Sequence, residues 1–120
     1  MYYDARVLLA DVENAAADIE RYLDGVDRIA YIGTDEKQAA VERKFEIIGE
    51  ALNRLHDIDP DLSQRIPQLR RIVDFRNLLS HGYDRVMPER VWTYANNNLP
   101  ELRRIVQALI TELGPVKNDN

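Results

Sequence analysis

The stretch IPQLRRIVDFRNLLSHGY, from Ile66 to Tyr83, joins a helical pattern to a polar end. Its apolar residues recur at steps of three and four and predict one buried helical stripe: Leu69, Ile72, Val73, Leu78 and Leu79. Pro67 suits the first helical turn, and Gly82 is typical of a helix C-terminus. The stretch therefore predicts a helix that ends in a turn.

The polar residues gather at that C-terminal end: Arg76, Asn77, Ser80, His81 and Tyr83. Five helical residues turn the chain by about 500°, so Arg76 and His81 point about 140° apart. Asn77 and His81, four residues apart, share a face. Arg76 is long enough to bend towards the same edge of the helix.

An arginine and a histidine placed so close suit chemistry at a phosphodiester. The guanidinium grips phosphate through two parallel N–H donors, and imidazole is the side chain best suited to moving a proton near neutral pH. The residue types alone also fit a simpler interpretation, in which His81 caps carbonyls at the negative end of the helix dipole.

Three blocks of the sequence resemble one family. RNLLSHGY, residues 76–83, matches an Arg-x-x-x-x-His-x-Tyr signature, and VERKFEIIGEALNRL (Val41–Leu55) and VWTYANNNLPEL (Val91–Leu102) match the family's flanking helices in order and spacing. Across roughly residues 5–113 the chain resembles the HepT-like proteins of the HEPN superfamily.

The resemblance implies a small all-helical homodimer that acts as the toxin of a HepT/MntA-type, type VII-like toxin–antitoxin pair. Such toxins are metal-independent endoribonucleases and need no cofactor. Carried onto this sequence, Arg76 and His81 would be catalytic at a dimer cleft that binds RNA, with Asn77 and Ser80 in supporting roles. The partner would be a nucleotidyltransferase antitoxin that adds AMP to Tyr83. For an arbitrary tyrosine, a packed ring with a bonded hydroxyl is the alternative.

Length and composition favour one domain. The 120 residues predict a single helical domain at residues 1–115, with residues 116–120 as a loose tail. There is no cysteine, no apolar run long enough to span a membrane and no recognisable signal peptide, so we expect a cytoplasmic protein that does not enter the membrane.

We expect an antiparallel bundle of four main helices, with residues 3–26 forming the first and 35–57 the second. In the connector, Ile29, Tyr31 and Ile32 are predicted to enter the core. The last helix should begin at Pro88 and kink at Pro100, or restart there with Asn98 as cap.

Gly49 interrupts the strong apolar stripe of the second helix, and a close approach of another helix or of a dimer axis would explain it. Glu42, Glu46 and Glu50 could form a metal-binding face, but the Glu-x-x-His spacing of di-metal bundles is missing, so we predict a solvated face and no metal. His56, which opens the turn HDIDPDLS, is expected to be a surface or capping residue.

The charge divides unevenly along an acidic chain of net charge −5. Residues 1–64 hold seven basic and fifteen acidic residues, or −8, whereas residues 65–104 hold eight arginines and four acids, or +4, and residues 105–120 add −1. Arginine without lysine favours phosphate binding. Some of these arginines could instead pair with acids of the first half.

Two non-catalytic functions also fit the sequence. The chain could be a nucleotide- or substrate-binding subunit that serves a nucleotidyltransferase, or an interaction protein whose segment Arg76–Tyr83 is an interface. Cleavage of RNA by the purified protein, and its loss in His81→Ala, would separate the ribonuclease from both.

Overall fold

The computed structural model describes residues 4–81 and 87–114; the side chains of Ser80 and His81 also fall outside the description. The described chain is all-helical, which confirms the predicted class. The helices are α1 (Ala5–Leu23), α2 (Arg28–Ile32), α3 (Asp35–Ile58), α4 (Pro60–Ser63), α5 (Leu69–His81), α6 (Pro88–Asn97) and α7 (Leu99–Leu113).

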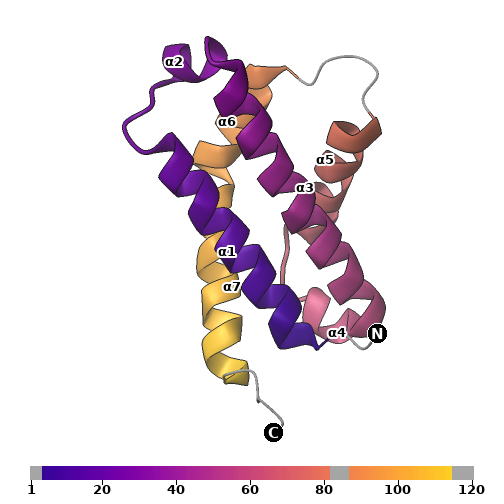
Figure 1. Cartoon of the computed structure of the whole chain (residues 1–120). Coiled ribbons are helices and arrows are strands. Elements are labelled where there is room, and N and C mark those ends of the chain that lie inside the picture. Colours follow the sequence, from indigo (N-terminus) through magenta and orange to yellow (C-terminus); the bar gives the residue numbers. More distant parts are fainter. Residues whose placement is uncertain (1–3, 82–86, 115–120) are drawn as a thin grey trace, which may run out of the picture.

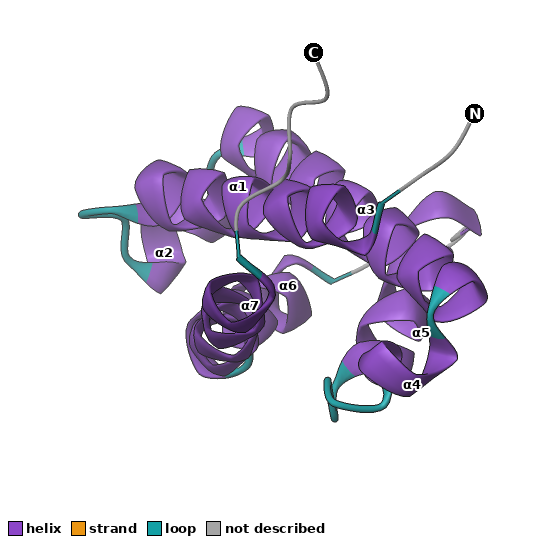
Figure 2. Cartoon of the chain, turned by 90° about the horizontal axis from the view of Figure 1, so that it is seen from below, coloured by secondary structure: helices purple, strands orange, loops and turns teal. Residues whose placement is uncertain are grey.

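The long helices alternate in direction, with α1 and α3 side by side at the centre (Figure 1). Helix α5 packs on α3, and α7 packs on α1. Seen from below, α5 and α7 lie under the α1–α3 layer and apart from one another (Figure 2). The contacts between α5 and the α6–α7 segment are therefore made by side chains that reach across, because these helices do not pack closely on one another.

Helix α1 begins where Asp4 accepts a hydrogen bond from the Arg6 amide at 2.8 Å, a side-chain N-cap. It ends at Leu23, just before Gly25, whose φ of 72° suits a residue without a side chain. The structure thus places α1 inside the expected range of residues 3–26.

The core consists of the apolar stripes of the long helices. The five predicted α3 residues are each 0% exposed: Val41, Phe45, Ile48, Leu52 and Leu55. In the connector, Tyr31 is fully buried and Ile32 partly buried, but the prediction for Ile29 was wrong, because its side chain is 80% exposed. Ile29 lies in the short helix α2, on the side away from the core that Tyr31 enters.

The predicted stripe of α5 needs two corrections. Leu78 is 40% exposed, whereas Phe75, which was not assigned to the stripe, is buried. The reason is the turn of the helix, since Leu69, Ile72 and Phe75 recur at three-residue steps on the side facing the core. Pro67 also precedes the helix, lying in a turn before Leu69 rather than in the first helical turn.

The last helical segment is interrupted rather than kinked. Asn98 ends α6 and precedes α7, and Pro100 stands in the first turn of the new helix, where its missing N–H does no harm. This is the restart alternative, although the Asn98 side chain makes no capping hydrogen bond. Pro88 begins α6 as predicted.

Two smaller features complete the fold. His56 lies in the last turn of α3, within the range predicted for the second helix, and its Nδ1 lies 3.0 Å from the buried Oγ of Ser63 in α4. None of the helices in the described ranges is both long enough and apolar enough to cross a membrane.

Candidate active site at the end of α5

Helix α5 is fixed to the rest of the molecule through its apolar side. Phe75 stacks on Tyr94 of α6, with ring centroids 4.9 Å apart, and meets Phe45 of α3 edge to face at 5.3 Å. Phe45 also meets Tyr94 edge to face at 5.7 Å. These three rings set the rotation of α5 about its axis, and so the direction in which its polar residues project.

Arg76 lies against α3 at the position of Gly49. A Cβ placed on Gly49 would come within 2.2 Å of the Arg76 Cβ and 2.6 Å of its Cγ. No side chain fits in that space, so Gly49 allows the aliphatic stem of Arg76 to pack directly on the α3 backbone. Of the two explanations offered for this glycine, the close helix approach within one chain is therefore sufficient.

The guanidinium of Arg76 turns towards the next residue. Its Nη1 donates a hydrogen bond to Asn77 Oδ1 at 3.1 Å, in an exposed part of the helix. The buried Nε makes no hydrogen bond to any residue that the structure describes. The stem of Arg76 is thus held while its charged end reaches the side of α5 that carries Asn77.

The other predicted site residues are located only in part. Ser80 and His81 form the last turn of α5, so His81 follows Asn77 by four residues on the same side of the helix. Their side chains, and the whole of Tyr83, lie outside the described residues. The geometry brings Arg76 and Asn77 together and leaves the predicted roles of Ser80, His81 and Tyr83 as expectations.

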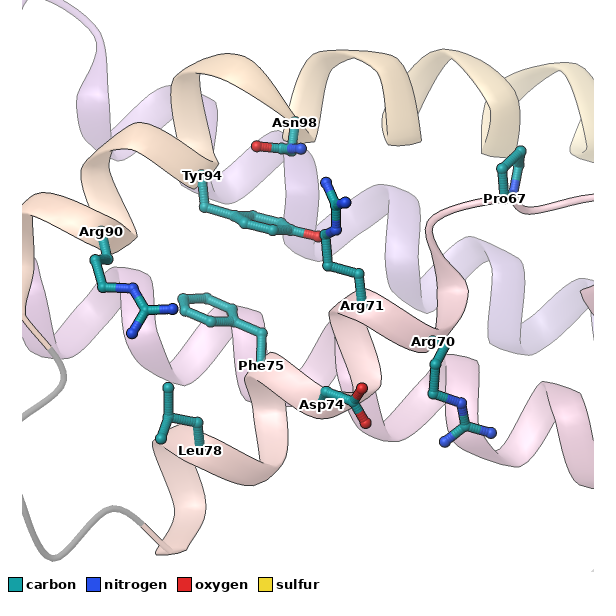
Figure 3. Close-up of a pocket in the computed structure, with 9 residues that line it drawn as sticks. All are labelled: Pro67, Arg70, Arg71, Asp74, Phe75, Leu78, Arg90, Tyr94 and Asn98. Atoms are coloured by element: carbon teal, nitrogen blue, oxygen red, sulfur yellow. The ribbon is translucent and has the colours of Figure 1, made fainter.

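A second feature is a groove of about 670 Å³ between α5 and the α6–α7 junction, which we call the arginine groove (Figure 3). It is lined by Pro67, Arg70, Arg71, Asp74, Phe75, Leu78, Arg90, Tyr94 and Asn98. Burial raises the pKa of the Tyr94 phenol to about 12, against a smaller opposing effect of Arg71. The phenol therefore stays neutral beside the three cations.

Apart from Arg76 and from Arg85, which lies outside the described residues, the arginines of residues 65–104 divide into two groups of three. Arg103 of α7 bonds both Glu13 and Glu20 of α1, as expected if some arginines pair with acids of the first half. Arg65 forms a two-pronged bond with Glu112, and Arg104 lies 3.7 Å from Glu101. Arg70, Arg71 and Arg90 make no ion pair with any described residue, and all three line the arginine groove.

Two of the three acids on the face of α3 that was considered for metal binding, Glu46 and Glu50, form ion pairs with arginines of the same helix. Glu46 contacts Arg43 at 3.3 Å, and Glu50 contacts Arg54 at 3.2 Å. Burial and the charge of Glu46 together raise the pKa of Glu42. In the described ranges, no group of three acidic or histidine side chains is placed to hold a metal ion.

Comparison with known proteins decides the family. The family described as Ribonuclease HepT-like matches residues 12–109, which is most of the chain. The chain belongs to this family. The match includes the whole of α5 and every described residue of the HepT-like signature.

Individual relatives share about a quarter of their aligned residues with this chain. The chain is 26% identical to "Putative RNase MJ1380" of Methanocaldococcus jannaschii over 106 residues, covering 87% of this chain and 94% of the relative. It is 27% identical to "Putative RNase MJ0125" of the same organism over 112 residues, covering 92% and 94%. No solved structure matches the chain.

Sequence reasoning missed the arginine groove, although the signal was present. The excess of arginine in residues 65–104 was visible, but which arginines remain unpaired depends on the packing of α1 against α7. It also did not connect Gly49 with Arg76. The two residues are 27 positions apart in the sequence, and only the crossing of α3 and α5 brings them into contact.

Proposed function

We propose that this protein is a metal-independent endoribonuclease and the toxin of a toxin–antitoxin pair. Membership of the HepT-like family supports ribonuclease activity. The observation that carries the proposal is the position of Arg76. Its stem packs on Gly49, and its guanidinium binds Asn77. Asn77 in turn lies four residues before His81 on the same helix.

In this proposal, the ribose 2′-OH is the nucleophile. His81 takes the proton from the 2′ oxygen, which bonds to phosphorus while the bond from phosphorus to the 5′ oxygen breaks. A proton is returned to the leaving 5′ oxygen, and the products are a 2′,3′-cyclic phosphate and a 5′-hydroxyl. No metal enters these steps.

Arg76 binds the phosphate and offsets the charge that grows on its non-bridging oxygens. A fixed guanidinium does this better than a free one, because less reorganisation is needed when the charge develops. The packing of the Arg76 stem on Gly49 supports such a role. Asn77 would hold the guanidinium or orient His81, and Ser80 would support the same end of the helix.

One arginine and one histidine make a sparse site, so we propose that two copies of the chain form the cleft. A two-fold axis would place two Arg76 and two His81 on one scissile phosphate, so that one imidazole accepts a proton while the other donates. Because the contact with Arg76 already accounts for Gly49, the glycine no longer supports the dimer. Light scattering at micromolar concentration should give the mass of a dimer.

We further propose that a nucleotidyltransferase antitoxin neutralises the protein by adding AMP to Tyr83. Tyr83 follows His81 by two residues in the sequence. A phosphate added there would compete with the substrate phosphate for Arg76 and obstruct the cleft. This role of Tyr83 is supported by the resemblance of residues 76–83 to the HepT-like signature.

The test is cleavage of RNA by the purified protein in the presence of EDTA. The proposal predicts products that end in a 2′,3′-cyclic phosphate, and no cleavage at a position where the 2′-OH is replaced by hydrogen. A protein that binds nucleotides in a titration but leaves RNA intact would instead be a non-catalytic binding subunit, which the three unpaired arginines of the groove would also suit.

A further inference from the structure

The arginine groove collects cations that the fold itself does not use. Arg70, Arg71 and Arg90 come from two helices, yet none is bonded to an acid in the described part of the chain. Among the described residues that line the groove, the only acid is Asp74, so these residues carry three positive charges and one negative, a net of +2. The whole chain has a net charge of −5. A polyanion approaching this acidic protein would therefore be attracted to the groove.

Beside these cations lie neutral polar groups that have no hydrogen-bond partner among the described residues. The Tyr94 hydroxyl is buried and makes no hydrogen bond to a described residue, and the Asn98 side chain makes no capping bond. Figure 3 shows Arg71 extending from α5 towards both of them, and Arg90 extending from α6 towards Phe75. Guanidinium forks with neighbouring amide and phenol groups suit phosphate oxygens and sugar hydroxyls.

The groove also leads to the candidate active site. Asp74 lines the groove, and His81 follows it by seven residues, which is about two helical turns and therefore nearly the same side of α5. Leu78, the exposed leucine of α5, lines the groove between these two positions. A strand lying in the groove and following α5 towards its C-terminus would reach the position of His81 about 10 Å beyond Asp74.

We propose that the arginine groove binds the sugar–phosphate backbone of single-stranded RNA and directs it to the cleavage site at the end of α5. This inference rests on the proposed ribonuclease function and adds a substrate-binding site to it. Arg70, Arg71 and Arg90 hold consecutive parts of the backbone, and the contacts are to phosphate, so binding is largely independent of base sequence.

The test measures binding without cleavage. The probe is a fluorescein-labelled single-stranded RNA whose 2′ hydroxyls are methylated, so that it has no nucleophile and cannot be cut. Its dissociation constant is measured by fluorescence anisotropy over a series of salt concentrations, for the wild-type protein and for the triple variant Arg70→Gln, Arg71→Gln, Arg90→Gln. The triple variant should bind at least about tenfold more weakly. Its slope of log affinity against log salt should be shallower by about 2, since each contact with a single-stranded phosphate contributes about 0.7.

The chain offers a control with the same change in net charge. Arg21, Arg43 and Arg104 have side chains that are 70%, 66% and 74% exposed, and each forms an ion pair with an acid three residues away. Arg21 also lies over the ring of Tyr22, 5.0 Å from its centroid. None lines the groove. The triple variant Arg21→Gln, Arg43→Gln, Arg104→Gln should keep the wild-type affinity within about twofold and the wild-type salt slope.

Several results would overturn the proposal. Equal weakening by the two triple variants would show that net charge alone matters, and wild-type affinity in the groove variant would show that RNA does not bind there. A groove variant that changes oligomeric state in light scattering would make the groove an interface between copies. If the triple variant does not fold, each single variant should still flatten the slope by about 0.7, and three unchanged slopes reject the site. Failure of the wild-type protein to cleave ordinary RNA contradicts the ribonuclease, whereas these binding results test the groove.

Discussion

Gly49 of α3 and Arg76 of α5 share one space: a Cβ on the glycine would lie 2.2 Å from the Cβ of the arginine. The Cβ added to Gly49 would also lie 3.4 Å from the carbonyl oxygen of Ile72. The absence of a side chain at residue 49 therefore lets α5 approach α3 closely enough for the Arg76 stem to rest on it. A residue of the candidate site is thus positioned by a residue of the bundle's central helix.

Gly49→Ala should destabilise the protein, although alanine is the better helix former. Helix propensity alone predicts a gain of about 1 kcal/mol, whereas overpacking against the Arg76 Cβ predicts a loss of about 1–3 kcal/mol. Because the clash is with the start of the arginine side chain and not its flexible end, we expect the loss to prevail and RNA cleavage to fall. Asn53→Ala, at an exposed position of the same helix, is the control for propensity and should change stability by less than about 0.5 kcal/mol. Urea unfolding that finds Gly49→Ala more stable than the wild type would refute the contact.

Arg103 should serve the fold and not the chemistry. It joins α7 to α1 by bonding both Glu13 and Glu20, and these carboxylates raise the pKa of its guanidinium. Arg103→Ala should lower the free energy of unfolding by about 1–2 kcal/mol and leave RNA cleavage unchanged at temperatures where the variant is folded. Arg104→Ala, one residue further along α7 and far more exposed, should change stability by less than about 0.5 kcal/mol. Equal effects of the two substitutions on stability would contradict this assignment.

Tyr94 should make stability sensitive to alkaline pH. Its pKa in the folded protein is about 12, above the ordinary value of 10.0, because burial disfavours the phenolate. The contribution of the neutral phenol is complete below pH 10 and is lost as the pH rises towards 12, since the unfolded chain releases the proton first. Tyr94→Phe, which keeps the ring stacked on Phe75, should reduce the fall in stability over that range. Burial also raises the pKa of Tyr31, so the Tyr94→Phe variant should still lose some stability over the same pH range. An unchanged pH slope in Tyr94→Phe would show that this phenol does not titrate differently on unfolding.

Tyr83 should be the residue that receives AMP. Incubation of the protein with ATP and its cognate nucleotidyltransferase should add one or more AMP units at this residue and suppress RNA cleavage, because the new phosphate would occupy Arg76. Tyr83→Phe, treated in the same way, should remain unmodified and active. Mass spectrometry that locates the adduct on Tyr31 or Tyr94, or finds none, would reject this form of regulation and leave the nuclease proposal in place.

The sequence predicted those parts of the fold that depend on local periodicity. The stripe of α3, the start of α6 at Pro88 and the all-helical class all follow from the spacing of apolar residues and from proline chemistry. The residues whose burial was predicted wrongly lie where only one side of a helical turn can face the core. Ile29 is exposed because a single helical turn can bury only one side, and Tyr31 takes it.

The sequence names the residues of the candidate site, but it does not predict how they are arranged. The signature marked Arg76 and Asn77 as neighbours in sequence, and the structure joins them by a hydrogen bond. The support of Arg76 by Gly49 and the meeting of Arg70 and Arg71 with Arg90 both depend on how helices cross. Such contacts between distant residues have no periodic signal within either helix.

The most direct test of the central claim is the rate of RNA cleavage by Arg76→Ala and His81→Ala, measured with EDTA present beside the wild type and the control Arg104→Ala. Circular dichroism and thermal unfolding should show that every variant retains the helical fold. The account predicts that both site variants lose cleavage, by about 100-fold or more, while Arg104→Ala cleaves at the wild-type rate. Cleavage by a folded His81→Ala at the wild-type rate would contradict it.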